Sequence, residues 1–496
     1  MAQNQSAQNR KGSSHSQGGA GHSNLILQHA GNIRSVYDLD EKKIGEGAFG
    51  SVCLGTHKVT GTVRAIKSVP RGSQKNYELL AKEIATMKAM DHPHIIQLFE
   101  TFEDRRCIYF AMELCSGGEL FDRIAEQHHF VERDAAVVMK QILQSINYLH
   151  DRDIAHRDLK PENYLFLTKD PIQGNLLKLI DFGLACPSPP GKYLKTKLGT
   201  VFYMAPQVLM GRYCKSCDVW SIGVIMYIML SGRPPFRGQT DQETFAKIRE
   251  GVLNLQGSTW GDISPDAKGL LKMLMKYSPQ ARYTAGQALE HDWIAHLAPK
   301  CSGKCLGSSV VDRLKAFKNQ NQLKKAALEI AATQLEEGQI KALRESFECL
   351  DVNGDGKLSM TELTEGLEKL GLDLSGFDVK GIVANLDGDG SGAIDYTEFL
   401  AAALDKKVAL TEEVLWTCFN VFDQNGDGKI SPEELKICLD SPDASKVVNT
   451  QRVAKLLKEV DLDGDGFIDF AEFVTLVRGA PDAAVEVPGA AASGGA

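Results

Sequence analysis

The sequence predicts an α+β fold for residues 37–294 and an all-α domain of two lobes for residues 339–479. In the first region, strand-like runs come early and helical runs follow. In the second, a twelve-residue loop rich in Asp and Gly recurs four times between amphipathic stretches. A polar and then basic segment over residues 295–338 lies between them, so we expect two folded units and a connecting helix.

Both ends of the chain have compositions that bury little apolar surface. Residues 1–36 are rich in Gln, Ser, Gly, Asn and His, and residues 480–496 form a low-complexity stretch. We therefore expect a disordered N-terminal tail and a second tail at the C-terminus.

Charge, hydropathy and cysteine spacing exclude several classes of protein. The formal net charge of −8 argues against a nucleic-acid partner. No run approaches the ~18 apolar residues of a spanning helix, and Ala2 stands where myristoylation requires glycine. We therefore expect a cytoplasmic protein without a membrane anchor. The 11 cysteines lack a regular spacing, which favours free thiols over disulfides, and over zinc at Cys214/Cys217 or Cys301/Cys305.

The stretch "IGEGAFGSV", Ile44 to Val52, has three glycines at GxGxxG spacing. Alone this is weak evidence, because dinucleotide-binding folds use similar glycines before a helix and ordinary hairpins contain glycine too. Here the β-like "SVCLG" follows, so strand–turn–strand is predicted. Glycines at such a turn let backbone N–H groups approach phosphate oxygens.

Further motifs follow in a fixed order. "RAIK" ends in Lys67, Glu83 lies in the helical "LLAKEIATMKAM", and "HRDLKPEN", "DFG" and "GTVFYMAPQ" come later. Together with the glycine loop they resemble the eukaryotic protein kinase family, which implies a bilobal protein-kinase fold. Lys160 within "HRDLKPEN" is similar to the serine/threonine type.

The resemblance implies a site for ATP and Mg²⁺. Lys67 would bind the α- and β-phosphates and would itself be held by Glu83. Asp181 and Asn163 would bind Mg²⁺, which prefers hard oxygen ligands. The residues assigned to the nucleotide site and its border are Ile44, Gly45, Glu46, Gly47, Ala48, Phe49, Gly50, Val52, Ala65, Lys67, Met112, Glu113, Cys115, Glu119, Glu162, Asn163 and Asp181.

The resemblance also implies how a substrate is used. Asp158 would orient the acceptor hydroxyl and take its proton, and Lys160 would steady the transferring phosphate. Glu119 and Glu162 match acidic positions that recognise basic residues upstream of the acceptor in related kinases, although solvated carboxylates are the alternative. We expect protein substrates with basic residues upstream of the acceptor.

Two positions bear on regulation. Gln207 replaces the usual Glu that pairs with an Arg, here Arg282. The exchange of Glu for Gln would lower the local stability by roughly 1–3 kcal/mol if this site is buried. It would not affect phosphoryl transfer itself. Thr196 could carry a phosphate that Arg157 receives. The alternative, a loop that needs no phosphate, is favoured by the regulatory half.

The four repeated loops begin at 351, 387, 423 and 461, in steps of 36, 36 and 38 residues. Each carries Asp at position 1, Asp or Asn at 3, Asp or Ser at 5, Gly at 6 and Glu at 12, which resembles the EF-hands of calmodulin. Calcium accepts six to eight oxygens, so such loops suit it. The expected ligands are Asp351, Asn353, Asp355, Lys357 and Glu362; Asp387, Asp389, Ser391, Ala393 and Glu398; Asp423, Asn425, Asp427, Lys429 and Glu434; and Asp461, Asp463, Asp465, Phe467 and Glu472, with the residue at position 7 using its backbone carbonyl.

The segment "VVDRLKAFKNQNQLKKAALEI" is basic and amphipathic. Its apolar stripe slips near residues 319–322, so one unbroken helix is not assured. The stripe would fill a groove opened by calcium, and the basic side chains would face acidic groups of the substrate cleft. The apolar residues are Val311, Leu314, Phe317, Leu323, Ala327 and Ile330, and the basic ones are Arg313, Lys315, Lys318, Lys324 and Lys325.

The order of kinase domain, junction and four EF-hands resembles the calcium-dependent protein kinases of plants and protists over residues 37–478. The resemblance implies a monomer whose junction blocks the kinase at low calcium and is released when its EF-hands bind calcium. A spacer helix with a solvated basic face is the alternative for the junction. An inactive scaffold would lack Lys67, Asp158 or Asp181, and all three are present. A calcium buffer or a kinase driven by separate calmodulin is also weaker than this interpretation.

Overall fold

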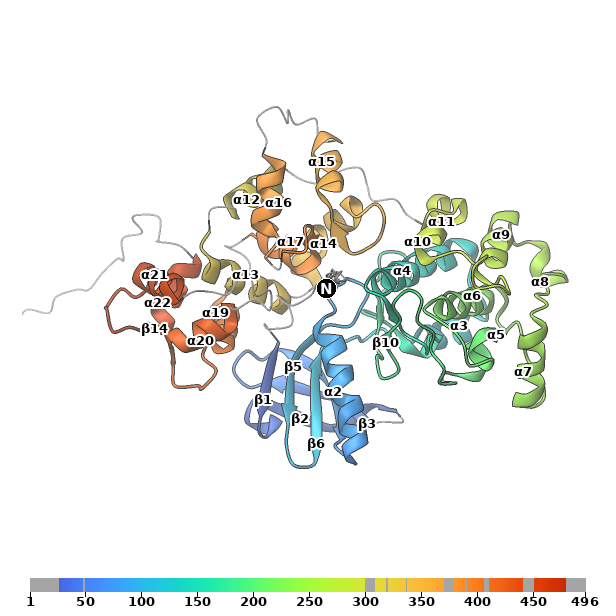
Figure 1. The fold of residues 1–496 in the computed structure, drawn as a ribbon, viewed down its shortest axis with the longest axis horizontal. Helices are drawn as coiled ribbons and strands as arrows, with labels where there is room; N and C mark the ends of the chain where they lie inside the picture. The colour runs from blue at the N-terminus through green and yellow to red at the C-terminus, as the bar shows by residue number, and fades with distance from the viewer. Residues whose placement is uncertain are drawn as a thin grey trace, which may run out of the picture.

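The computed structural model describes residues 26–47, 50–298, 308–317, 320–335, 337–369, 378–388, 390–405, 410–439 and 450–478. Within them the chain forms a bilobal domain of strands and helices, followed by two helical lobes (Figure 1). The predicted α+β fold followed by an all-α domain is therefore confirmed, apart from two-residue strands within the helical lobes.

The first lobe of the bilobal domain is a six-stranded sheet that shares a core with one long helix, α2 (Gln74–Lys88). The strands lie in the order β1-β5-β6-β4-β3-β2, and β1 and β5 are the one parallel pair within this sheet. Their bounds are β1 (Leu27–Ala30), β2 (Tyr37–Gly47), β3 (Gly50–His57), β4 (Val63–Pro70), β5 (Leu98–Glu103) and β6 (Cys107–Met112).

Residues 26–36 contradict the prediction of a disordered tail as far as residue 36. They form β1 and a 3₁₀ helix, η1 (Ile33–Ser35), and the side chains of Ile26 and Ile33 are only 7% and 1% exposed. Ile26 stands in an apolar run of only three residues and Ile33 stands alone, so neither gives a periodic pattern within the polar composition of residues 1–36. The rest of the predicted tail, residues 1–25, lies outside the described residues.

The second lobe of the bilobal domain is built around helix α6 (Ser216–Ser231), in which every residue from Cys217 to Leu230 is buried. A helix that is apolar on all sides belongs in the centre of a domain. It ends at Gly232, whose φ of 74° is the left-handed conformation of a helix C-terminus. The other elements are α3 (Leu120–Gln127), α4 (Glu132–Asp151), β7 (Ile154–Ala155), η2 (Pro161–Asn163), β8 (Tyr164–Phe166), β9 (Leu177–Leu179), β10 (Cys186–Pro187), η3 (Val201–Tyr203), α5 (Pro206–Leu209), α7 (Asp241–Glu250), α8 (Ser258–Gly261), α9 (Pro265–Leu274), α10 (Ala285–Leu289) and α11 (Asp292–Leu297).

The junction forms two helices, α12 (Ser308–Phe317) and α13 (Gln322–Gln334). Asn321 begins the second, because its side-chain oxygen accepts the N–H of Lys324 at 2.8 Å. The slip in the apolar stripe therefore falls between two helices, and Lys318 lies outside the described residues. Both helices lie between the two helical lobes (Figure 1).

The first helical lobe (residues 337–405) and the second helical lobe (residues 410–478) each contain two of the predicted calcium loops. Short strands join the loops of each lobe, with Leu358 opposite Ile394 and Ile430 opposite Ile468. The elements are α14 (Glu337–Leu350), β11 (Lys357–Leu358), α15 (Met360–Lys369), α16 (Val379–Leu386), β12 (Ile394–Asp395), α17 (Tyr396–Ala403), α19 (Glu412–Phe422), β13 (Lys429–Ile430), α20 (Pro432–Leu439), α21 (Thr450–Val460), β14 (Ile468–Asp469) and α22 (Phe470–Arg478).

The cysteines test the prediction of free thiols. Cys214 and Cys217 are free thiols, as predicted, whereas Cys349 is disulfide-bonded, so the prediction of free thiols is wrong at that position. Cys301 and Cys305 lie outside the described residues.

Among the helices of the described part, none has the length and apolar character needed to cross a membrane.

Candidate functional site

The glycine-rich loop is the predicted hairpin between β2 and β3. Gly47 lies opposite Gly50 where the two strands meet. A Cβ atom at Gly50 would lie 2.1 Å from the carbonyl oxygen of Ser68, so the packing of β3 on β4 requires glycine there. Ala48 and Phe49, at the tip, lie outside the described residues.

The predicted adenine border lies where β4 and β6 meet the segment that joins the two lobes of the bilobal domain. Ala65 on β4 pairs with Met112 at the end of β6, and both side chains are buried. Glu113 follows, with its carboxylate 2.9 Å from the ammonium of Lys178 in the second lobe. Cys115 is a partly buried free thiol, and burial raises its pKa. The Glu113–Lys178 ion pair therefore fixes the joining segment to the second lobe.

Lys67 and Glu83 form the ion pair predicted from the sequence. Lys67 Nζ on β4 lies 2.7 Å from Glu83 Oε1 on α2. Asp181 lies nearby, since a Cβ atom at Gly183 would be 3.3 Å from Asp181 Oδ1 and 3.6 Å from Glu83 Oε2. Asp181 Oδ1 also accepts the backbone N–H of Gly183 at 3.0 Å. The phosphate-binding and metal-binding candidates therefore lie close together.

Asp158 is surrounded by groups that orient its carboxylate. Lys160 Nζ lies 3.4 Å from one oxygen, and Thr200 donates to the other from its hydroxyl at 2.9 Å and its N–H at 3.0 Å. The Asn163 amide donates to the backbone oxygen of Asp158 at 2.8 Å. Sequence analysis did not assign Thr200 a role, although it stands in the quoted "GTVFYMAPQ" motif.

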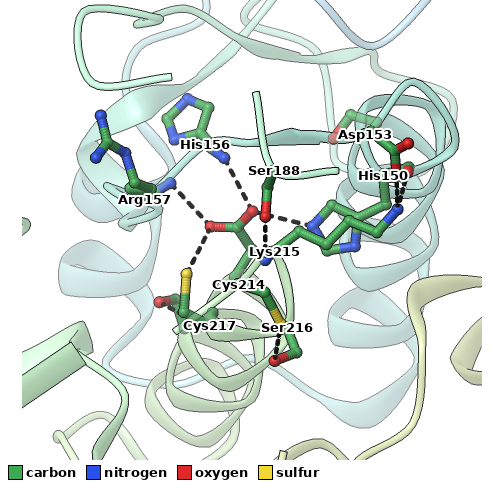
Figure 2. A network of polar contacts seen from close by, with 12 residues as sticks. His150, Asp153, His156, Arg157, Ser188, Cys214, Lys215, Ser216 and Cys217 are labelled. Atoms are coloured by element: carbon green, nitrogen blue, oxygen red, sulfur yellow. Dashed lines mark hydrogen bonds and ion pairs between the residues drawn. The ribbon is translucent and has the colours of Figure 1, made fainter. Parts of the chain in front are cut away.

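Asp218, which sequence analysis also missed, fixes the backbone before Asp158. Its buried carboxylate accepts the N–H groups of His156 and Arg157 at 2.9 and 2.8 Å and bonds His150 Nε2 at 2.9 Å (Figure 2). Burial alone would raise the pKa of Asp218, but these hydrogen bonds and the neighbouring histidines lower it. Arg157 has a φ of 74°, an unfavourable conformation that the bonds from Asp218 stabilise.

Glu119 and Glu162 form an acidic border beside the catalytic loop. Burial, followed by the charges of Asp122 and Glu162, raises the pKa of Glu119. One oxygen of Glu162 is buried and has no hydrogen-bond partner among the described residues. Two carboxylates whose negative charges lie this close together favour the binding of a cation.

Gln207 meets Arg282 as the sequence predicts, over a long hydrogen bond of 3.4 Å. The Gln207 amide nitrogen is buried and has no partner within the described residues. Burial lowers the pKa of Arg282 to about 10. Gln therefore supplies the hydrogen bond without the charge that would compensate the buried guanidinium.

Thr196 lies exposed on the segment after "DFG". Its backbone oxygen accepts the Tyr213 hydroxyl at 2.6 Å. Arg157 donates from Nε to the Leu184 carbonyl at 2.7 Å and reaches the same Tyr213 hydroxyl at 3.5 Å. Arg157 therefore contacts the segment after "DFG" and Tyr213, and phosphorylation of Thr196 stays a prediction.

The four acidic loops repeat one hydrogen-bond pattern. In each, the position-12 glutamate accepts the N–H groups of positions 2 and 9, and the position-1 aspartate accepts the N–H of the position-6 glycine. The position-6 glycines have φ between 75° and 88°, which a side chain would strain. Of the expected ligands, Asp389 lies outside the described residues.

The donor set of these loops fits calcium. In the fourth loop, oxygens of Asp461, Asp463 and Glu472 lie within 4.8 Å of one another. In the first loop, burial and then the charge of Asp355 raise the pKa of Asp351 to about 8. Converging carboxylates that repel one another are what a hard divalent cation stabilises. The loop residues would hold calcium with their carboxylate and carbonyl oxygens.

The fold and these sites define a protein kinase joined to pairs of EF-hands. A model for the protein kinase domain matches residues 39–294, and a model for the EF-hand domain pair matches residues 340–404 and 412–478. The bilobal protein-kinase fold implied by the resemblance is therefore confirmed.

The relatives identify the family. Calcium-dependent protein kinase 3 of Plasmodium berghei is 42% identical over 462 residues, 92% of this chain and 82% of that protein. Calcium-dependent protein kinase 5 of Plasmodium falciparum is 39% identical, covering 92% and 80%, and calcium-dependent protein kinase 7 of Arabidopsis thaliana is 38% identical, covering 91% and 84%. The chain belongs to the calcium-dependent protein kinase family and is a protein kinase.

Proposed function

We propose that this kinase transfers the γ-phosphate of ATP to serine and threonine hydroxyls of proteins. Asp158 would accept the hydroxyl proton, since Lys160 and Thr200 already orient its carboxylate. Lys67, paired with Glu83, would bind the nucleotide phosphates. Asp181 and Asn163 would hold Mg²⁺, which neutralises charge on the phosphates.

We further propose that the junction is a calcium-controlled switch, and one observation carries this proposal. The six apolar residues predicted from its stripe are all at most 3% exposed and share one core with Phe399 of the first helical lobe and Phe419 of the second. This burial supports a mechanism in which EF-hand grooves opened by calcium hold the junction as an amphipathic helix.

The basic side chains of the junction agree with this arrangement. Lys324 is buried, and Lys325 donates to the carbonyl oxygen of Asn385 in the first helical lobe at 2.7 Å. At low calcium we propose that the lobes release the junction, whose basic residues then face Glu119 and Glu162. A shift from ~1% to ~99% active requires roughly 5.5 kcal/mol of preference, which several calcium sites would supply together.

The test is ³²P transfer from Mg-ATP to a Ser/Thr peptide with saturating calcium and with chelator. The full chain is expected to be active with calcium and at least tenfold slower with chelator, and Asp158→Asn should remove activity in both conditions. Equal activity in both conditions would overturn the switch while leaving the kinase assignment intact. No activity in either condition would overturn the kinase mechanism.

A preference for basic substrates rests on the acidic border. Glu162→Gln is expected to raise KM about tenfold for a peptide with arginine upstream of the acceptor, and to leave KM unchanged for a peptide with alanine there. Glu126→Gln, an exposed change on α3, is the matched control. An equal effect on both peptides would contradict the proposed recognition.

A further inference from the structure

Residues 26–31 lie along the edge of the sheet, next to the end of α2 that follows Glu83. β1 runs parallel to β5, with Leu27 opposite Glu100 and Ala30 opposite Glu103. The N–H of Gly31 continues the pairing by donating to the Glu103 carbonyl at 3.0 Å. We name residues 26–31 the edge strap. It covers a sheet edge that would otherwise be open.

The edge strap is attached to α2 by one polar contact, and its Ile26 side chain lies in the hydrophobic core that α2 also enters. Ile26 is 7% exposed and belongs to the same core as Leu80 and Met87 of α2. Lys88, the last residue of α2, donates from Nζ to the carbonyl oxygen of Ile26 at 3.2 Å. The ring of His29 stacks on Phe102 of β5 with centroids 4.5 Å apart, which fixes the strap to the sheet.

Helix α2 needs such support, because only one face of it is buried. Leu80, Glu83 and Met87 are buried, whereas most of the other described side chains of this helix are exposed or half-buried. Glu83 lies five residues before Lys88, so a movement of the last turn of α2 would also move Glu83 relative to Lys67. A displaced Glu83 would no longer orient Lys67 for the nucleotide phosphates.

We propose that the edge strap positions α2, and through it the Lys67–Glu83 ion pair, for catalysis. The strap is thus a positioning element and touches no reacting atom. Its outer side borders a cavity of about 260 Å³ that Gln334 of α13 and Asp423 of the third acidic loop also line. The strap therefore contacts α2 at Lys88 and lines a cavity that the regulatory half of the chain also lines. The proposal rests on the kinase activity alone and is independent of the calcium switch.

Two shortened chains test the role of the strap. The chain of residues 26–496 keeps it, and the chain of residues 32–496 removes it while retaining the buried Ile33. With saturating calcium, loss of the strap is expected to lower kcat about tenfold, with little change in KM for the peptide. Hydrogen exchange in residues 74–88 should become faster. Equal kcat and equal exchange for both chains would overturn the proposal.

Point variants separate positioning from a failure to fold. In the full chain, Ile26→Val should keep near-native kcat and Ile26→Asp should lower it about tenfold, because a charge would enter an apolar core. Adding a peptide of residues 26–36 to the 32–496 chain should restore part of kcat. If both point variants lower kcat equally and the peptide restores nothing, the strap has no positioning role.

Discussion

The two helical lobes differ in what they contact, although they repeat the same loops. The first lies against the bilobal domain, where the N–H and hydroxyl of Thr397 donate to the buried carboxylate of Asp91 at 2.9 and 2.7 Å. The Asn147 amide donates to the carbonyl oxygens of Asn353 and Gly354, at positions 3 and 4 of the first loop, at 3.5 and 3.4 Å. The contact is close, because a Cβ atom at Gly356 would lie 2.6 Å from both His92 and Tyr148.

The second helical lobe packs mainly around the junction. Its helices α19, α20 and α22 contact α13, and the Cys418 thiol donates to the carbonyl oxygen of Ala327 at 3.4 Å. Trp416 and Phe419 stack beside Phe470, with ring centroids 4.8–5.8 Å apart. The comparison indicates that both lobes hold the junction, because α17 of the first lobe also contacts α12 and α13, and that the first lobe in addition docks on the kinase domain.

The largest expected effect comes from breaking the hold of the two helical lobes on the junction. Leu323 is fully buried on α13, so Leu323→Asp would bury a carboxylate among apolar groups at a cost of several kcal/mol, roughly 3 or more. We expect calcium-stimulated ³²P transfer to fall at least tenfold. Ala316→Asp, an exposed change on α12, is the control and should leave activation unchanged. Full activation of Leu323→Asp would contradict the proposed hold of the helical lobes on the junction.

A smaller effect is expected from the docking contact of the first lobe. Removing either partner of the Asp91–Thr397 pair leaves a buried polar group unsatisfied, which costs about 1.5–3 kcal/mol. Asp91→Asn, Thr397→Val and the double variant should therefore be non-additive in chemical denaturation of the calcium-loaded chain. Thr475→Val, at an exposed helical position of the second lobe, should change stability little. If the losses in free energy of unfolding of the two single variants add up in the double variant, the Asp91–Thr397 contact does not contribute to docking.

The smallest effect concerns two lysines at position 7 of their loops. Lys429 pairs with Asp465, an expected ligand in the fourth loop, whereas Lys357 pairs at 2.9 Å with Asp395, which is not an expected ligand. Lys429→Met should tighten calcium binding in the second lobe about two- to fivefold, the range of an exposed ion pair. Lys357→Met should change calcium binding in the first lobe less. Calorimetric calcium titration of the full chain checks this, and equal changes would mean that only net charge matters.

Sequence spacing predicted the contacts that recurring motifs encode. The Lys67–Glu83 pair and the Gln207–Arg282 contact are confirmed. These predictions succeeded because each motif pairs residues whose chemistry has a fixed use.

The remaining contacts could not be predicted from the sequence, because they form only in the tertiary structure. Asp91 and Thr397 are 306 positions apart in the sequence, and each looks like an ordinary surface residue until the lobes dock. Asp218 lies within an apolar run, so its carboxylate had no visible partner. The edge strap was missed because the apolar run of residues 25–27 is only three residues long within a polar tail, and Ile26 becomes buried when the strap pairs with the edge of the sheet.

The central claim is that the junction changes partners with calcium, and a distance measurement tests it most directly. Spectroscopic labels would be placed by non-natural amino acids at exposed positions 316 on α12 and 126 on α3, and their separation measured by pulsed electron resonance in the full chain. The account predicts a long separation with calcium, when the helical lobes bind the junction, and a shorter one with chelator, when the junction faces Glu119 and Glu162. An unchanged separation, or a longer one with chelator, would contradict it.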